Sequence, residues 1–217
     1  MGRKKSKNPI ILFAKSLVKP FYFFFMKQKG IFYLKQGIKR GNIKLVIGAS
    51  GKFEKGWTVS DIEYLNMLND SDWQRFFKTN SIEMIMAEHV WEHLTPEDAA
   101  TAANNCFKYL KPGGHLRIAI PDGNHSNSDY IEQVKPGGLG YGSDDHKVLY
   151  TISSVSKLFE NAGFKVKGLE YFDENHKFIC NDWDPEKGKI RRSKRFDSRN
   201  ANDDLSYTSL IIDAIKE

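Results

Sequence analysis

Apolar and polar positions change pattern along the chain so that strands and helices are expected in turn from Asn42 onward. Short runs rich in Ile, Val and Leu predict strands at 43–47, 57–60, 81–87, 115–120, 164–169 and 207–215. Longer amphipathic stretches predict helices at 95–110 and 152–162. Strands that alternate with helices favour an α/β fold, in which a mostly parallel sheet is covered on both faces.

The helix expected at 95–110 has a clear beginning and end in the sequence. Thr95 is a good N-cap residue, Pro96 suits the first helical position, and acidic residues follow in the first turn. The sequence K-P-G-G at 111–114 then ends the helix.

Residues 1–40 are expected to form a basic and aromatic appendage to a single domain at 41–217, which carries an irregular insertion at about 174–206. The interruptions at Lys15, Lys19 and Pro20 divide the apolar stretch into pieces shorter than the about 20 residues that a transmembrane helix needs.

The basic and aromatic side chains at 3–29 suit contact with an anionic membrane surface. A helix that packs on the domain, with its lysines in water, is the alternative. The start of the chain also fits an N-myristoylation pattern, although six residues match such a pattern easily by chance.

The net charge of +6 is concentrated near the N-terminus. Residues 1–53 contain 13 Lys and Arg and no acidic residue, whereas the remainder contains 20 basic and 27 acidic residues. This distribution argues against a nucleic-acid channel that runs over the whole domain. Two cysteines are too few for a disulfide framework, and we therefore expect a cytoplasmic protein. Its basic and aromatic N-terminus would place it at the inner face of the membrane.

Small and acidic residues follow the expected strands, at the positions where ligands bind to a parallel α/β sheet. The first strand ends in G-A-S-G at 48–51, a loop whose backbone N–H groups can approach a ligand. The second strand ends at Asp61, whose carboxylate can accept hydrogen bonds from both hydroxyls of a ribose. Together these features predict an adenosine-type ligand.

The stretch 82–122 carries the most specific pattern of the chain. Its segments A-E-H-V-W-E-H-L-T and Y-L-K-P-G-G-H-L-R-I-A-I-P-D resemble the region between the fourth and fifth strands of class I methyltransferases that depend on S-adenosylmethionine (SAM), in particular a bacterial group of predicted enzymes. The resemblance extends over roughly 45–216. It implies a doubly wound, Rossmann-like sheet of seven strands with a final antiparallel strand, methyltransferase activity, and SAM as the cofactor.

The resemblance also implies which residues bind SAM. The loop beside the methionine part would be Gly48, Ala49, Ser50 and Gly51. The ribose would be held by Asp61, adenine would lie near Asp72 and Trp73, and the floor of the pocket would be lined by Glu88 and His89. The chain departs from the family pattern at Val46, where many methyltransferases have an acid, and at Ser50 and Lys52, which replace glycines of the usual G-x-G-x-G.

The motif H-V-W-E-H at 89–93 also matches the inverted zinc-peptidase motif H-x-x-E-H. On a helix, His89 and His93 would share a face and bind zinc, with Glu92 as general base. An apolar strand runs directly into the motif, however, and the next helix begins only after Thr95. We therefore expect no metal site, and we expect His93 to be packed and hydrogen-bonded.

The glycine-rich segment 122–146 follows the strand at 115–120, where an acceptor would approach the methyl donor. Methyl transfer to a hydroxyl needs a base, and histidine titrates in a suitable range. We predict His146 as that base with Asp145 as its orienting partner, and His89 as the next candidate. The alternative is that Asp144 and Asp145 only cap a turn in solvent. A metal site made of His and Asp residues is not favoured, because their spacing matches no fixed ligand pattern.

The resemblance, together with the basic and aromatic N-terminus, implies methyl transfer from SAM to a small-molecule or saccharide acceptor, such as a surface glycan precursor handled near the membrane. The second basic cluster at 191–199 would bind a phosphate or carboxylate of the substrate, or lie in solvent. RNA methylation, with the N-terminal arm on phosphates, and a non-catalytic SAM-binding partner module are the alternatives. The oligomeric state is left open.

Overall fold

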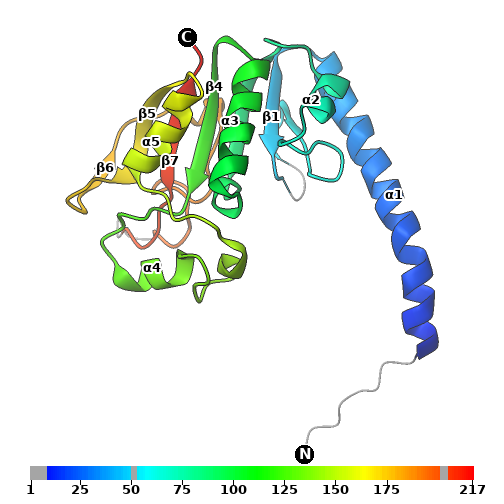
Figure 1. Ribbon diagram of the computed structural model, residues 1–217, viewed down its shortest axis with the longest axis horizontal. Coiled ribbons are helices and arrows are strands. Elements are labelled where there is room, and N and C mark those ends of the chain that lie inside the picture. Colours follow the sequence, from blue (N-terminus) through cyan, green and yellow to red (C-terminus); the bar gives the residue numbers. More distant parts are fainter. Residues whose placement is uncertain (1–8, 50–52, 201–204) are drawn as a thin grey trace, which may run out of the picture.

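A computed structural model describes residues 9–49, 53–200 and 205–217. Within them a single sheet has the strand order β2-β1-β3-β4-β7-β5-β6 (Figure 1). The strands are β1 (Ile43–Ile47), β2 (Trp57–Val59), β3 (Ile82–Glu88), β4 (Leu110–Ile120), β5 (Lys165–Phe172), β6 (Phe178–Cys180) and β7 (Leu210–Ile215).

The sheet is mostly parallel. β1 pairs in parallel with β2 and β3, and β3 pairs in parallel with β4. β7 lies between β4 and β5 and is antiparallel to both, while β6 is antiparallel to β5. The predicted α/β fold, with seven strands and a final antiparallel strand, is confirmed. The short edge strand β6 was not expected.

The described helices are α1 (Pro9–Lys39), α2 (Asp70–Phe76), α3 (Pro96–Tyr109), α4 (Ser128–Val134) and α5 (Ile152–Asn161). Helix α3 begins as the sequence indicates, because the Thr95 hydroxyl accepts a hydrogen bond from the N–H of Asp98 at 3.2 Å. Helices α2 and α4 were not predicted, since seven residues carry too little amphipathic pattern to be recognised.

The two faces of the sheet are covered by different kinds of structure. Side chains alternate along a strand, so Leu45 and Ile47 of β1 belong to the core beneath α1, α2, α3 and α5. Val46, between them, belongs to a second core with Trp183 and Ile190. In the described part of the chain, the irregular insertion therefore covers the face of the sheet opposite these helices.

A buried ion pair fastens the insertion to the sheet. Arg117 of β4, only 1% exposed, lies opposite Asp213 of β7 in the strand register and binds its carboxylate with two hydrogen bonds of 2.7 and 2.8 Å. The same guanidinium donates to the backbone carbonyls of Asp184 and Gly188 in the insertion, each at 2.8 Å.

Glu170 of β5 fastens the insertion at a second point. Its carboxylate accepts hydrogen bonds from the indole N–H of Trp183, the backbone N–H of Lys194 and the hydroxyl of Thr208, at 2.7 to 2.9 Å. These contacts position the arginine-rich part of the insertion beside the carboxyl ends of the strands.

Helix α1 is continuous through Pro20, although Lys15, Lys19 and Pro20 interrupt its apolar sequence. Its C-terminal part packs on the domain: Ile31 and Leu34 are buried in the helix-side core, and a Cβ on Gly37 would lie 2.0 Å from the Thr58 hydroxyl oxygen. The N-terminal part of α1 extends away from the domain (Figure 1). Among the described residues, no helix has the length and apolar character needed to span a bilayer.

Candidate active site

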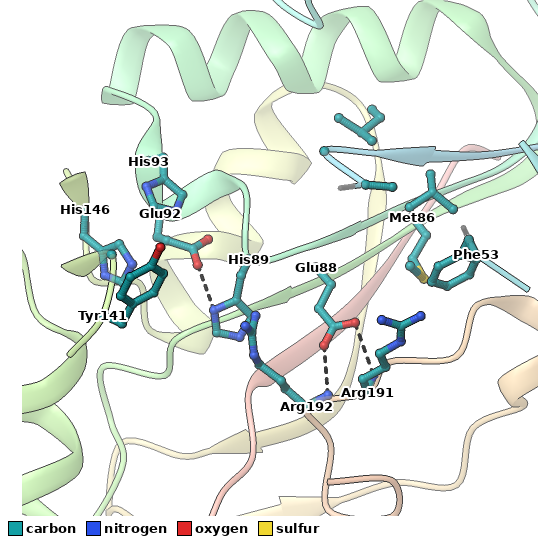
Figure 2. Close-up of a pocket in the computed structure, with 15 residues that line it drawn as sticks. Phe53, Met86, Glu88, His89, Glu92, His93, Tyr141, His146, Arg191 and Arg192 are labelled. Atoms are coloured by element: carbon teal, nitrogen blue, oxygen red, sulfur yellow. Dashed lines mark hydrogen bonds and ion pairs between the residues drawn. The ribbon is translucent and has the colours of Figure 1, made fainter. Parts of the chain in front are cut away.

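A cavity of about 570 Å³ lies at the carboxyl ends of β1 and β3. Its wall is formed by the ends of these two strands, Phe53 before β2, the turn after β3, the glycine-rich segment and the insertion. The lining residues are Val46, Ile47, Gly48, Ala49, Phe53, Met86, Glu88, His89, Glu92, His93, Tyr141, Gly142, His146, Arg191 and Arg192. Figure 2 shows histidines at one end of the cavity and Phe53 with Met86 at the other.

At Gly48, at the end of β1, the backbone passes close to the side chain of Val90. Gly48 has a φ of +70°, and a Cβ at this position would lie 2.7 Å from a methyl group of Val90. Any side chain would therefore be strained and would collide with the turn after β3. Gly48 and Ala49 line the cavity as predicted, whereas Ser50 and Gly51 lie outside the described residues.

Glu88 and His89 lie where the strand-end prediction placed them, on the cavity wall. The Glu88 carboxylate accepts hydrogen bonds from the backbone N–H groups of Arg191 and Arg192, at 3.2 and 2.9 Å (Figure 2). This contact brings the arginine side chains to the cavity. Glu88 thus holds the insertion in place as well as lining the floor.

Both ring nitrogens of His89 already have close neighbours. Nδ1 lies 2.9 Å from a carboxylate oxygen of Glu92, and Nε2 lies 3.0 Å from the hydroxyl of Ser209. The residue sits in the left-handed region with a φ of +55°, directly after β3. The turn at 91–93 is a short 3₁₀ helix, so His89 and His93 do not share an α-helical face as the zinc-peptidase motif requires.

His146 lines the same cavity as Gly48 and Glu88, which is the location predicted for the base. Its Nδ1 lies 2.6 Å from the carbonyl oxygen of Val134, and since a carbonyl only accepts, Nδ1 carries the proton and Nε2 has the free lone pair. The backbone N–H groups of Lys147 and Val148 donate to the carbonyl of Glu92. This pairing joins the glycine-rich segment to the turn after β3.

Asp145 does not orient His146 as predicted. Its carboxylate lies 3.0 Å from the Lys147 ammonium and 3.4 Å from Nδ1 of His93. The Lys147 hydrogen bond, with a smaller effect from His93, holds the pKa of Asp145 below its usual range. The carbonyl of Val134 orients His146 instead, and Asp145 is the neighbour of His93.

Glu92, His93 and His146 form a cluster that the sequence did not reveal. One potential ligand atom from each residue lies within 4.8 Å of the other two. Glu92 has no exposed surface, and the rings of His93 and His146 meet edge to face with centroids 4.9 Å apart. The residue types in H-x-x-E-H were the available signal, but the partner of Glu92 and His93 is His146, which lies far along the chain.

A second cavity of about 470 Å³ adjoins the first and shares His89, Tyr141, His146 and Arg192 with it. Its wall also contains Arg199, whose guanidinium carbon lies 3.5 Å from the ring centre of Tyr207. Arginine and tyrosine side chains therefore surround the approach to His146.

The residues predicted to hold the ribose and adenine of the cofactor do not line either cavity. Asp61 follows β2 as predicted but does not line either cavity, and its carboxylate accepts a long hydrogen bond from the backbone of Glu63. Asp72 accepts from the backbone N–H of Asn66. Trp73 is 0% exposed and its indole donates to the carbonyl of Met67, so it belongs to the core and is not available to contact adenine.

His125, within the glycine-rich segment, is a core residue. Its ring stacks on Tyr130 with centroids 4.0 Å apart, and burial lowers its pKa to about 4. Asp122 nearby accepts hydrogen bonds from the backbone N–H groups of Phe172 and Asn124, yet burial raises its pKa to about 6. Neither residue lines either of the two cavities, and their contacts support the fold of the segment.

Residues 44–168, more than half of the chain, match the model of a family described as a methyltransferase domain. The chain belongs to this methyltransferase family. The prediction of a class I methyltransferase that uses SAM is thereby confirmed. The sequence matches none of the curated proteins compared with it.

Several solved methyltransferases resemble the chain in fold. A SAM-dependent methyltransferase from Thermotoga maritima is 14% identical, with a TM-score of 0.49 over 94% of this chain and 97% of that chain. One from Archaeoglobus fulgidus is 17% identical, with a TM-score of 0.45 over 95% and 100%. One from Mesorhizobium loti is 11% identical, with a TM-score of 0.48 over 80% and 90%.

Proposed function

We propose that this methyltransferase acts on a hydroxyl group of a small-molecule or saccharide acceptor that carries a phosphate or a carboxylate. The observation that carries the proposal is the position of His146, which lies in the wall shared by the two cavities with its Nε2 lone pair free. The larger cavity would hold the methyl donor and the smaller one the acceptor.

The residues of the larger cavity fit SAM. The backbone at Gly48 has no side chain, and one could not be accommodated beside Val90. The volume of about 570 Å³ lies within the range of small-molecule sites. Gly48, Ala49 and Glu88 would hold the cofactor, with Asp61 proposed for the ribose. When bound, SAM supplies an electrophilic methyl group on a sulfonium.

The chain's own residues would then position and activate the acceptor. Proximity of the two reactants supplies much of the acceleration in such a transfer. His146 provides the lone pair through which the acceptor hydroxyl is activated, and transfer of the proton to Nε2 is the simplest use of it. His89 is less suited to this role because both of its nitrogens have neighbours within 3.0 Å.

The charge around the smaller cavity favours an anionic acceptor. Arg192 lines both cavities, and Arg199 lines the smaller one. Arginine binds phosphate and carboxylate groups with two parallel hydrogen bonds when its guanidinium is free. Arg199 is already paired with Asp197 at 2.6 Å, which makes Arg192 the residue proposed to bind the substrate.

The N-terminal part of α1 is proposed to lie on an anionic membrane surface. Its exposed Phe24, Phe25 and Met26 adjoin lysines, and no acidic residue precedes Glu54 in the chain. Apolar side chains beside cations are the combination that binds at a lipid headgroup layer. An acceptor handled near the membrane would then meet the enzyme there.

The test is to measure formation of S-adenosylhomocysteine with a panel of hydroxyl compounds that carry phosphate or carboxylate groups. His146→Ala should lower turnover by about 10²- to 10⁴-fold, the usual contribution of a positioned base, with SAM affinity nearly unchanged. His176→Ala, in a residue outside both cavities, is the matched control and should leave turnover intact. Unchanged turnover in His146→Ala would refute the assignment.

A further inference from the structure

Glu92 is a buried carboxylate without a hydrogen-bond partner. Its side chain is fully buried, and within the described part of the chain no donor forms a hydrogen bond to either oxygen. Nδ1 of His89 lies 2.9 Å from one of these oxygens without forming a hydrogen bond to it. Buried charges in proteins are generally paired or coordinate metal ions, because an isolated buried carboxylate is very costly.

One of the two histidines beside Glu92, His146, is oriented as metal-binding histidines are. Such a histidine usually has its non-coordinating nitrogen next to a carbonyl or carboxylate, which sets the tautomer and the ring orientation. Nδ1 of His146 donates to the Val134 carbonyl at 2.6 Å, so its Nε2 is available for a ligand. Nδ1 of His93 lies 3.4 Å from the Asp145 carboxylate and forms no hydrogen bond within the described residues.

The main chain fixes the spacing of these three side chains. Glu92 and His93 are in the same 3₁₀ turn, and the Glu92 carbonyl accepts hydrogen bonds from the N–H groups that follow His146. The cluster lines the larger cavity, so a species bound to it would be open to substrate on one side (Figure 2).

We propose that Glu92, His93 and His146 bind one divalent first-row transition-metal ion, for which Zn²⁺ is the natural probe. Two imidazoles and one carboxylate, with a fourth position open to the cavity, form a donor set typical of catalytic zinc sites. The ligand atoms, within 4.8 Å of one another, need only small side-chain adjustments to surround one ion. Mg²⁺ prefers oxygen ligands and should bind much more weakly.

The catalytic role of the ion rests on the proposed function, which this inference deepens. It also replaces the expectation that the chain has no metal site. A hydroxyl oxygen bound to the ion becomes acidic and releases its proton to water. That oxygen then forms the O–CH₃ bond while the sulfur–methyl bond breaks. His146 would be a ligand in this scheme and not the group that takes the proton, and metal binding decides between the two uses.

The experiment is titration of full-length, untagged, chelator-treated protein with Zn²⁺ by calorimetry, and with Co²⁺ followed by visible absorption. We expect one ion per chain and cobalt bands of a low-coordinate nitrogen and oxygen site. His93→Ala and His146→Ala should each weaken Zn²⁺ binding at least about tenfold, since even loss of a residue that supports a ligand has an effect of this size. His176→Ala should bind as the wild type does, and Mg²⁺ should not compete.

Glu92→Gln separates loss of the ion from loss of the fold. The amide has nearly the same shape and no charge, so the metal-free variant should be at least as stable as the metal-free wild type, while Zn²⁺ should no longer raise its melting temperature. Absence of Zn²⁺ and Co²⁺ binding in the wild type, or equal binding in both histidine variants, would overturn the proposal. SAM binding and methyl transfer without metal would leave the proposed function standing, whereas metal binding without transfer to any hydroxyl would refute only the function.

Discussion

Replacing Arg117 with Met should destabilise the protein strongly and weaken the binding site at a distance. Met has a similar length and no charge, so the substitution removes the cation and leaves the core volume nearly intact. The carboxylate of Asp213 then stays buried opposite a neutral side chain. The carbonyls of Asp184 and Gly188 also lose the donor that fastens the insertion to the sheet.

The size of the effect follows from the burial of the pair. Breaking a buried ion pair on one side costs about 3–5 kcal/mol, because an uncompensated charge remains. Replacing both partners, in Arg117→Met/Asp213→Leu, removes that charge and should restore part of the loss. It should still leave about 2 kcal/mol of destabilisation, since the insertion carbonyls have no new donor and an unsatisfied buried acceptor costs about 1–3 kcal/mol.

Urea unfolding at neutral pH, followed by tryptophan fluorescence, measures both variants and the single Asp213→Leu change in one cycle. Trp183 reports locally, because its ring lies 4.9 Å from the Arg117 guanidinium carbon. Arg117→Lys, which keeps the charge, serves if the Met variant is too unstable to purify. A cost below about 1 kcal/mol for Arg117→Met, or effects that simply add across the cycle, would refute the reasoning.

Three further outcomes are expected. Removal of residues 1–29 should leave the domain folded and SAM binding intact while reducing sedimentation with anionic vesicles. Removal of residues 1–39 also deletes the buried Leu34 and should lower the melting temperature. Equal melting temperatures for the two deletions would show that α1 does not support the core. Asp61→Ala should weaken SAM binding by about 1–3 kcal/mol in calorimetry, and unchanged affinity would remove this residue from the site. The pKa of His125 is about 4 in the folded protein and 6.5 in the unfolded chain, so the unfolded state binds more protons between these values and stability falls as the pH falls through them. His125→Phe should therefore reduce the acid-induced loss between pH 6.5 and pH 4 by about 2 kcal/mol in urea titrations, and identical pH profiles would contradict the lowered pKa.

The central sheet could be predicted because its strands are buried on both faces. The run 43–47 is apolar at every position but Lys44, and 115–120 is apolar at all positions but His115 and Arg117, and this pattern is independent of any distant partner. The end of β1 was also predicted from local sequence, because the G-A-S-G segment at 48–51 follows the apolar run directly. The second layer could not be predicted, because the insertion has little regular structure and is held by individual contacts such as those of Glu170.

The positions at the carboxyl ends of the strands could be predicted better than the contacts between distant segments. Parallel strands place their carboxyl ends at one edge, so Gly48, Glu88 and His89 had to lie near one another once the sheet was recognised. Trp73 was misassigned because a tryptophan after a polar segment has the same sequence pattern whether it covers a ligand or fills the core. Its hydrogen bond to the Met67 carbonyl depends on tertiary structure alone.

The histidine cluster shows how residues of a recognised motif can have a neighbour that the spacing of the motif does not predict. H-x-x-E-H suggested metal binding through a helical spacing of His89 and His93, and the absence of a helix there led us to expect no metal. The third partner comes from the glycine-rich segment, which the backbone pairing with Glu92 brings into place. The wall of the larger cavity therefore combines strand ends that the sheet places together with long-range contacts, and those contacts depend on residues far apart in the sequence.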